Sequence, residues 1–119
     1  MVIGTDIIKI SRIKTLIDRE NGNALDFILT PHERAMKKSS HSIAGIFAAK
    51  EALLKAFGVG FSRGLGRLLE IEVKHDPYGK PFIITSGIVK EIQENKEIRN
   101  IELSISHDGD YCVAFVVCL

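Results

Sequence analysis

The sequence predicts an α+β fold in which an antiparallel sheet packs against helices. Three observations lead to this prediction. Strand-like apolar segments stand at both ends of the chain, three helical stretches follow the first of them, and short alternating segments come after the third helix. The chain has 119 residues, 45% of them hydrophobic, which suits one compact domain over residues 1–119.

The first half begins with the apolar stretch "MVIGTDIIKI", which predicts a strand. Ser11 follows it as the expected N-cap of a helix over residues 12–20. A second helix opens in "LTPHER", where a capping box sets three residues at the N-cap, first and third positions: Thr30, Pro31 and Glu33. The longest helix is expected to begin near Ser42 and to end at Gly58.

The second half predicts short strands, turns and one further helix. The glycines of "GVGFSRGLGR" indicate a loop. It is followed by a strand in "LLEIEVKH", a turn in "DPYGKP", a short strand in "FIIT" and a weakly amphipathic helix in "SGIVKEIQENKEI". The chain closes with a hairpin of "IELSIS" and "YCVAFVVCL", joined by a turn that contains Asp108 and Gly109.

Charge and targeting signals exclude several classes of protein. The net charge is +1, from 16 Lys and Arg against 15 Asp and Glu, which does not suggest general nucleic-acid binding. Asp6 and Lys9 interrupt the N-terminal apolar run, and no stretch reaches the ~20 apolar residues of a membrane span. Cys112 and Cys118 fall in one predicted strand, ~20 Å apart, too far for a disulfide. We expect a cytoplasmic protein with free thiols and no membrane partner.

The central segment "FAAKEALLKAFGVG", residues 47–60, carries three charges on its helix. Glu51 and Lys55 share one face at i,i+4 spacing, which suits either a surface ion pair or a functional pair. Lys50 falls in the apolar arc, where an ammonium must reach solvent along its stem, pair with an acid or meet a ligand. Alanines form the opposite face, which lets another element approach closely: Ala48, Ala49, Ala52 and Ala56.

Asp6 is the second unusual residue, because aspartate is depleted in strand interiors. It either bonds backbone amides near a strand end or ligates a metal. Together with Glu51 it would suit Mg²⁺, which binds one or two carboxylates plus waters and substrate phosphates. His107 ends a strand on the face of Ile105, as a structural or a functional residue.

Two other functions also fit the residues. One is a different Mg²⁺-dependent phosphodiester or nucleotide-binding activity. The other is a non-catalytic RNA-binding module, which would stack bases on exposed aromatic residues of its strands. The candidate strands offer mainly Tyr111, Phe115 and Phe82 for this purpose.

Three segments together resemble the holo-acyl-carrier-protein synthases, the small phosphopantetheinyl transferases. They are "GTDIIKISRI" at 4–13, "FAAKEALLKAFGVG" at 47–60 and "SISHDGDYCVAFVV" at 104–117. "LTPHE" at 29–33 and "GKP" at 79–81 also fit in the expected order, so the resemblance covers essentially the whole chain. It implies the 4′-phosphopantetheinyl transferase fold.

The resemblance implies Mg²⁺-dependent transfer of 4′-phosphopantetheine from coenzyme A to a serine of apo-acyl carrier protein, in support of fatty acid biosynthesis. Adenosine 3′,5′-bisphosphate is the other product. In the family, Mg²⁺ is held by two acids that match Asp6 and Glu51. A lysine matching Lys55 lies near the phosphates and the reaction centre, and an arginine matching Arg12 helps to dock the carrier protein. Glu51, His107 or a water on the metal could take the serine proton.

Family members of this length are typically homotrimers whose active sites are shared between neighbours. The turn of Gly79, Lys80 and Pro81 is then expected near the nucleotide bound by an adjacent subunit. We also expect contacts to coenzyme A from the central helix and the closing hairpin: Lys50, Lys55, Ser106 and His107.

One position departs from the family pattern. The family usually carries an arginine just before "FAAKE", and Ile46 stands there in this chain. Because isoleucine cannot contact phosphate, one contact to coenzyme A is either lost or supplied by another cation. The candidates are Lys80, Arg63 and Arg67.

Overall fold

The computed structural model describes residues 1–36, 39–59 and 65–119 of the chain. Its elements follow in the order β1 (Val2–Lys9), α1 (Ile10–Asp18), η1 (Arg19–Phe27), α2 (Pro31–Ala35), α3 (Ser40–Ala56), η2 (Leu65–Glu70), β2 (Ile71–His75), β3 (Pro81–Thr85), α5 (Gly87–Asn95), β4 (Ile101–Asp108) and β5 (Tyr111–Cys118). The elements η1 and η2 are 3₁₀-helices. The predicted α+β class is confirmed, with α1, α2 and α3 between the first two strands.

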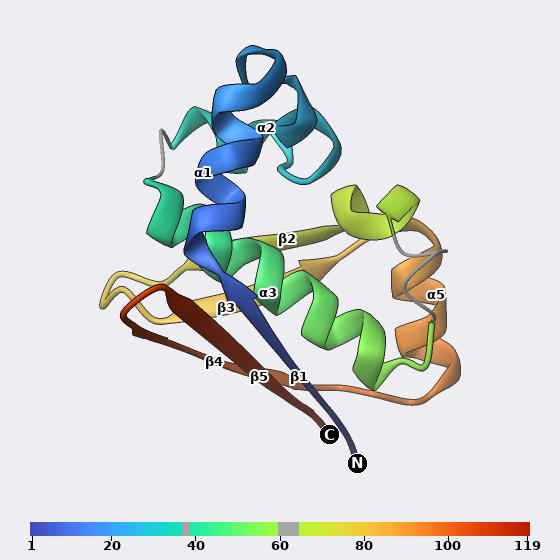
Figure 1. Cartoon of the computed structure of the whole chain (residues 1–119). Helices are drawn as coiled ribbons and strands as arrows, with labels where there is room; N and C mark the ends of the chain where they lie inside the picture. The colour runs from blue at the N-terminus through green and yellow to red at the C-terminus, as the bar shows by residue number, and fades with distance from the viewer. Residues whose placement is uncertain (37–38, 60–64) are drawn as a thin grey trace.

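The strands form two antiparallel sheets. The larger sheet has the order β1-β5-β4, so the last strand of the chain lies in its centre, and the smaller one is the β2–β3 hairpin. In the larger sheet Val2 lies opposite Cys118, which brings the two ends of the described chain side by side (Figure 1). The predicted closing hairpin is therefore present, and β1 extends it by one strand.

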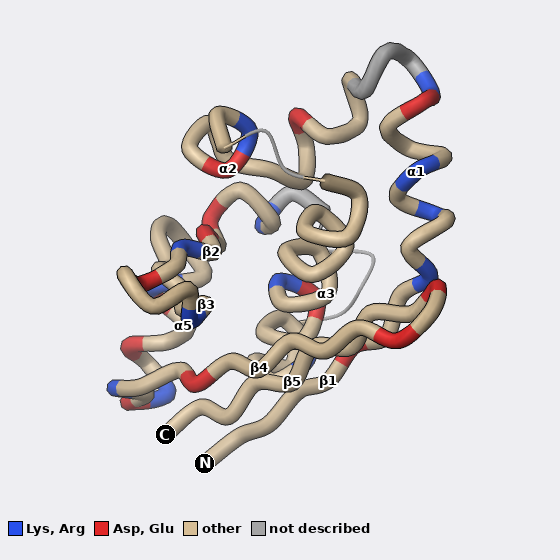
Figure 2. Tube along the Cα trace, turned by 90° about the vertical axis from the view of Figure 1, so that its left-hand side faces the viewer, with Lys and Arg blue, Asp and Glu red and all other residues tan. Residues whose placement is uncertain are grey.

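Helix α3 occupies the middle of the molecule. The three-stranded sheet lies along one side of it, β2, β3 and α5 flank it on another side, and α1 lies on the opposite flank (Figure 2). Most of its residues are buried, as its alternation of alanine and larger apolar residues requires. Two charged residues in its middle, Lys50 and Glu51, are buried with them.

The helix caps were predicted in part. Thr30 and Glu33 form the expected capping box, with Pro31 in the first turn of α2. Helix α3 begins at Ser40, two residues before the predicted start, and Gly58 follows its C-cap in a left-handed conformation with φ +74°.

The predicted N-cap role of Ser11 is wrong. Helix α1 begins at Ile10, and its cap Lys9 makes no side-chain hydrogen bond. Ser11 instead donates from its backbone N–H and its hydroxyl to the carboxylate of Asp110, at 2.9 and 2.7 Å. The β4–β5 turn therefore caps α1 from a distant part of the chain, which local sequence patterns do not indicate.

The segment before β2 also differs from the prediction. The sequence indicates a loop up to residue 67 and a strand from residue 68, but η2 spans Leu65–Glu70. Glu70 turns toward α5, where its carboxylate accepts a hydrogen bond from Val89 N–H at 3.0 Å and its carbonyl accepts one from Ser86 N–H at 2.8 Å. These contacts end the strand pairing at Ile71. The remaining part of the predicted loop, residues 60–64, lies outside the described residues.

Cys112 and Cys118 are free and buried, as predicted. Among the described residues, no helix combines the length and the apolar character that crossing a membrane requires.

Candidate functional site

Close packing between β1 and α3 brings the first two candidate residues together. A Cβ atom built on Gly4 would lie 1.9 Å from the carbonyl oxygen of Ala52, so strand and helix backbones are in direct contact there. The predicted close approach to the alanine face is thus confirmed. Asp6 is two residues further along β1 and faces α3 like Gly4, while Glu51 directly precedes Ala52.

Asp6 and Lys55 form an ion pair at this contact. The Nζ atom of Lys55 lies 2.9 Å from a carboxylate oxygen of Asp6 and also donates to the carbonyl of Thr5 at 3.2 Å. The lysine side chain is half exposed, whereas that of Asp6 is 11% exposed. Lys55 therefore pairs with Asp6, which is distant in the sequence, and its ammonium remains accessible to solvent.

Glu51 completes a group of two carboxylates and one ammonium. Burial is the main cause that raises its pKa above 4.5, the negative charge of Asp6 raises the pKa further, and Lys55 lowers it. The two acids therefore repel each other and Lys55 offsets the repulsion only in part. A bound cation would relieve this repulsion, so the pair fits a hard divalent ion.

The neighbouring groups are consistent with a site for Mg²⁺ rather than for a softer metal. Burial and the charge of Asp6 raise the pKa of the Cys112 thiol to about 11, so in the metal-free protein this thiol stays protonated at neutral pH. Within the described residues, no cluster of three or more His, Cys, Asp or Glu side chains could bind a metal by itself. If the two carboxylates bound Mg²⁺, the other positions of its coordination shell would be left to water and substrate oxygens.

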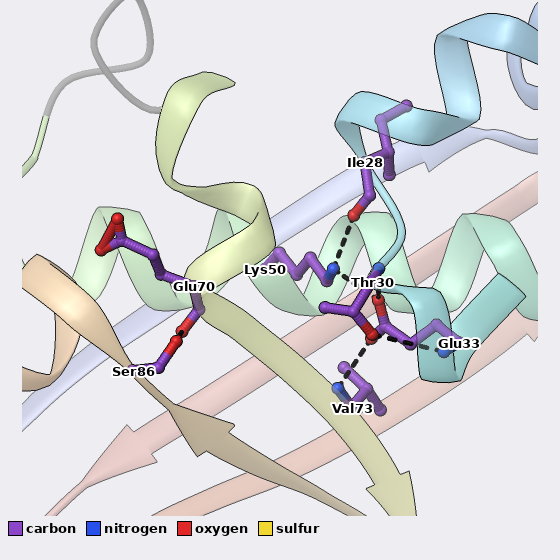
Figure 3. Close-up of polar contacts among 7 residues, drawn as sticks. All are labelled: Ile28, Thr30, Glu33, Lys50, Glu70, Val73 and Ser86. Carbon is purple, nitrogen blue, oxygen red and sulfur yellow. Dashed lines mark hydrogen bonds and ion pairs between the residues drawn. The ribbon is translucent and has the colours of Figure 1, made fainter.

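Lys50 does not belong to this group, which corrects its predicted contact with coenzyme A. Its side chain is fully buried, and its Nζ atom lies 2.7 Å from Glu33 and 2.6 Å from the carbonyl oxygen of Ile28 (Figure 3). Burial lowers the pKa of Lys50, while Glu33 raises it. The sequence left three possibilities for the Lys50 ammonium, which were to reach solvent, to pair with an acid or to meet a ligand. In the structure it pairs with an acid.

A cavity of about 210 Å³ lies between α3, the β2–β3 hairpin and β4. It brings together several predicted residues, and its lining is Ser42, Gly45, Ile46, Val73, His75, Pro81, Ile105 and His107. The ring of His107 lies 6.0 Å from that of His41, and its Nε2 atom is 3.1 Å from the His41 carbonyl oxygen. Ser106 points to the opposite face of the sheet, so it does not line this cavity with His107.

The position of the family arginine lies in this cavity. Ile46 lines it, and no Lys or Arg stands among the described residues around it. Of the three candidate replacements, Arg67 pairs with Glu70 at 2.9 Å and Lys80 lies 3.5 Å from Glu102. Arg63 lies outside the described residues.

The predicted turn after β2 is well defined. The carboxylate of Asp76 accepts hydrogen bonds from the backbone of Tyr78 and Lys80, and Gly79 has a φ of +85°, which favours glycine. Pro81 reaches the cavity, whereas Gly79 and Lys80 are exposed.

Arg12 lies elsewhere, on the exposed side of α1. It borders a hollow of about 290 Å³ between α1, β1 and α3, together with Ile8, Thr15, Leu16, Arg19 and Phe47. Several basic residues follow one another along α1 (Figure 2). Arg12 was predicted from the sequence as a candidate for carrier docking, whereas Arg19 was not. A spacing of seven residues places both on one face of a helical segment, which is a signal that the sequence offers.

The carboxylate pair and the cavity lie at opposite edges of the larger sheet. Asp6 belongs to the edge strand β1, and His107 to the other edge strand, β4. The structure of one chain thus joins Asp6, Glu51 and Lys55 in one group and Pro81 and His107 in another.

Comparison with known proteins identifies the family. Residues 2–116 match the model of the 4′-phosphopantetheinyl transferase superfamily. The chain belongs to this superfamily. A holo-[acyl-carrier-protein] synthase of Nautilia profundicola is 41% identical over 118 residues, which cover 99% of each chain. The predicted family and enzyme class are confirmed.

Solved structures support the same assignment. The chain is similar to Helicobacter pylori holo-[acyl-carrier-protein] synthase in complex with coenzyme A, with a TM-score of 0.85, 38% identity, and coverage of 98% of this chain and 99% of that one. It is also similar to the Neisseria meningitidis enzyme, with a TM-score of 0.87, 34% identity, and coverage of 100% and 99%. The predicted 4′-phosphopantetheinyl transferase fold is confirmed.

Proposed function

We propose that this protein transfers 4′-phosphopantetheine from coenzyme A to a serine hydroxyl of apo-acyl carrier protein. The reaction is Mg²⁺-dependent, releases adenosine 3′,5′-bisphosphate and serves fatty acid biosynthesis in the cytoplasm. The group of Asp6, Glu51 and Lys55 is the observation that carries the proposal, because it combines two carboxylates that would suit a divalent metal with an accessible ammonium. The similarity to an enzyme that binds coenzyme A supports the choice of substrate.

Asp6 and Glu51 would hold the metal, which neutralises charge on the diphosphate of coenzyme A when bound. Lys55 would neutralise the phosphate oxygens that gain charge as the leaving group departs. The serine oxygen forms a bond to the phosphorus that carries pantetheine, and the bond from that phosphorus to adenosine 3′,5′-bisphosphate breaks. Glu51 is the candidate acceptor of the serine proton, directly or through a water held by the metal, because its carboxylate lies beside the proposed reaction centre.

We further propose that the active enzyme is a homotrimer. The outer face of the larger sheet exposes large apolar side chains, namely Ile3, Ile7, Tyr111, Val113 and Phe115. The family resemblance implies active sites shared between neighbours, which would join the cavity of one chain to the carboxylate pair of another. Measurement of the molar mass in solution tests this assembly, and a monomer at working concentration would contradict it.

The same exposed face bears on the RNA-binding alternative. Tyr111 and Phe115 are exposed on the central strand β5, as an RNA-binding sheet would require. Their neighbours Ile3, Ile7 and Val113 are apolar, however, and phosphate recognition needs a basic surface. The face therefore suits another protein surface better than RNA.

Arg12 and Arg19 are the proposed contacts for the acidic carrier protein. Both border the hollow beside α1, which also offers the apolar Leu16 and Phe47 to a docking helix. Arg12→Ala should raise the KM for the carrier protein more than the KM for coenzyme A. Equal changes in the two constants would remove Arg12 from the docking surface.

The direct test mixes the protein with coenzyme A, Mg²⁺ and an apo-acyl carrier protein and measures the carrier by mass spectrometry. We expect an increase of one phosphopantetheine that requires the metal. Asp6→Ala and Glu51→Ala, checked for folding by circular dichroism, should each abolish the increase. An unchanged carrier mass with the wild-type protein would contradict the proposed function.

A further inference from the structure

The ion pair between Lys50 and Glu33 is a feature that the proposed reaction does not use. Both side chains have no exposed surface, and Nζ lies 2.7 Å from Oε1. The other bonds of the pair go to the backbone. Lys50 donates to the carbonyl of Ile28, and the carboxylate of Glu33 accepts from the N–H groups of Thr30 and Val73, both at 2.8 Å. No substrate can reach either charge.

Stability alone does not account for such a pair. A buried ion pair can often be replaced by apolar residues of similar size without loss of stability, whereas removal of one partner leaves an uncompensated buried charge. A fully satisfied buried network instead restricts its members to one arrangement, because each alternative leaves a polar group unpaired. Among the described residues, every buried side-chain nitrogen and oxygen has a hydrogen-bond partner.

The arrangement that the pair fixes includes the orientation of α3. Lys50 comes from α3, Glu33 from α2 and Val73 from β2, so the network ties the central helix to two neighbouring elements (Figure 3). Lys50 directly precedes Glu51, and successive helix residues point about 100° apart. The rotation of α3 that buries Lys50 against Glu33 therefore also turns Glu51 toward Asp6.

We propose that Lys50 and Glu33 are positioning residues, which hold α3 at the rotation that presents Glu51 to Asp6 for metal binding. The inference rests on the proposed function, since it takes Asp6 and Glu51 as the metal-binding pair. Neither Lys50 nor Glu33 touches the substrate. Without their pair, α3 can turn or shift, and Glu51 no longer holds its position opposite Asp6.

The test compares a neutral pair, Lys50→Met with Glu33→Gln, with the wild-type protein. Free Mn²⁺ is measured by electron paramagnetic resonance, with the metal alone and with coenzyme A present, and thermal midpoints are recorded in parallel. We expect the neutral pair to bind Mn²⁺ about tenfold more weakly, as changes to the supports of metal ligands typically do. The metal concentration for half-maximal transfer should rise by about the same factor.

A matched control removes an exposed pair from the same region. Arg34 and Asp26 lie 2.9 Å apart with side chains 43% and 56% exposed, so Arg34→Met with Asp26→Asn removes the same charges without disturbing a buried network. This control should bind Mn²⁺ like the wild type. If the neutral pair lowers the thermal midpoint but binds Mn²⁺ like the control, Lys50 and Glu33 only stabilise the fold and the inference is wrong.

Two further outcomes are informative. If the neutral pair does not fold, Lys50→Arg replaces it, because this variant keeps the charge but changes the length and shape of the side chain. We expect the same weakening of Mn²⁺ binding, and unchanged binding would overturn the inference. If the wild-type protein itself binds no Mn²⁺ with coenzyme A, the proposed metal site fails and the inference fails with it. Failure of the inference alone requires a wild type that binds the metal.

Discussion

Gly4→Ala is the substitution with the most definite expected effect on structure and activity together. The new Cβ would lie 1.9 Å from the carbonyl oxygen of Ala52, while an ordinary contact begins at 3.4 Å, so β1 and α3 must separate by about 1.5 Å. Because the neighbouring atoms belong to the backbone, no side chain can turn away. We expect a loss of about 3 kcal/mol in the free energy of unfolding, at the upper end for overpacking.

The same displacement should impair catalysis. Gly4 is two residues from Asp6, and Ala52 is next to Glu51, so the separation moves the two proposed metal ligands apart. A misplacement of 1 Å can reduce a rate by roughly 100-fold. We therefore expect kcat to fall by about that factor in the carrier-modification assay, at a temperature where the variant is folded.

Val89→Ala serves as the control for this prediction. Val89 is fully buried on α5, away from the carboxylate pair, and its truncation should cost about 2 kcal/mol without changing kcat. Urea denaturation measures both stabilities. If Gly4→Ala keeps the wild-type stability and kcat, the direct contact between β1 and α3 does not position the site.

Three more predictions concern single side chains. Glu51→Gln should abolish transfer, because it removes a proposed metal ligand. Because the pKa of Glu51 is raised in the folded protein, the same substitution should raise the thermal midpoint of the metal-free protein at neutral pH, and a lower midpoint would contradict the carboxylate repulsion. This gain should vanish below about pH 4.5, where Glu51 is protonated in both the folded and the unfolded protein. Lys55→Ala should lower kcat by roughly 100-fold, as loss of a charge-stabilising donor does, and unchanged kinetics would leave Lys55 as a surface ion pair. Asp110→Ala removes the cap of α1, so it should lower the free energy of unfolding by about 1 kcal/mol, measured by urea denaturation. It should also raise the KM for the carrier protein but not for coenzyme A, and equal changes in both KM values would show that α1 takes no part in docking.

Local patterns were sufficient to predict most of the fold. The capping box at Thr30, the glycine after α3 and the alternating strands each depend on interactions between residues close in the chain, which a sequence displays directly. Two of the errors arose where a distant residue decides the local structure. Asp110 caps α1 from the other end of the chain, and Glu70 turns toward α5 rather than extending β2.

In the candidate site, too, the sequence revealed features set by neighbouring residues but not contacts with distant ones. Asp6 and Glu51 were recognisable because each places a charge in an otherwise apolar segment, and the alanine face of α3 indicated the close approach that brings them together. The role of Lys50 was mistaken because its apolar surroundings reveal the need for a partner but not the partner's identity. Glu33 already had a capping role, so its second bond to Lys50 could not be inferred from the local motif.

The central claim is that Asp6 and Glu51 bind one divalent cation together with coenzyme A. The most direct measurement is isothermal titration of coenzyme A, with and without Mg²⁺, into the wild type, Asp6→Asn, Glu51→Gln and the double variant. We predict that Mg²⁺ tightens binding to the wild type, that each single variant loses this gain, and that the double variant loses nothing more, because the two acids act on one ion. Single variants that keep the Mg²⁺-dependent gain, or losses that simply add, would contradict the account.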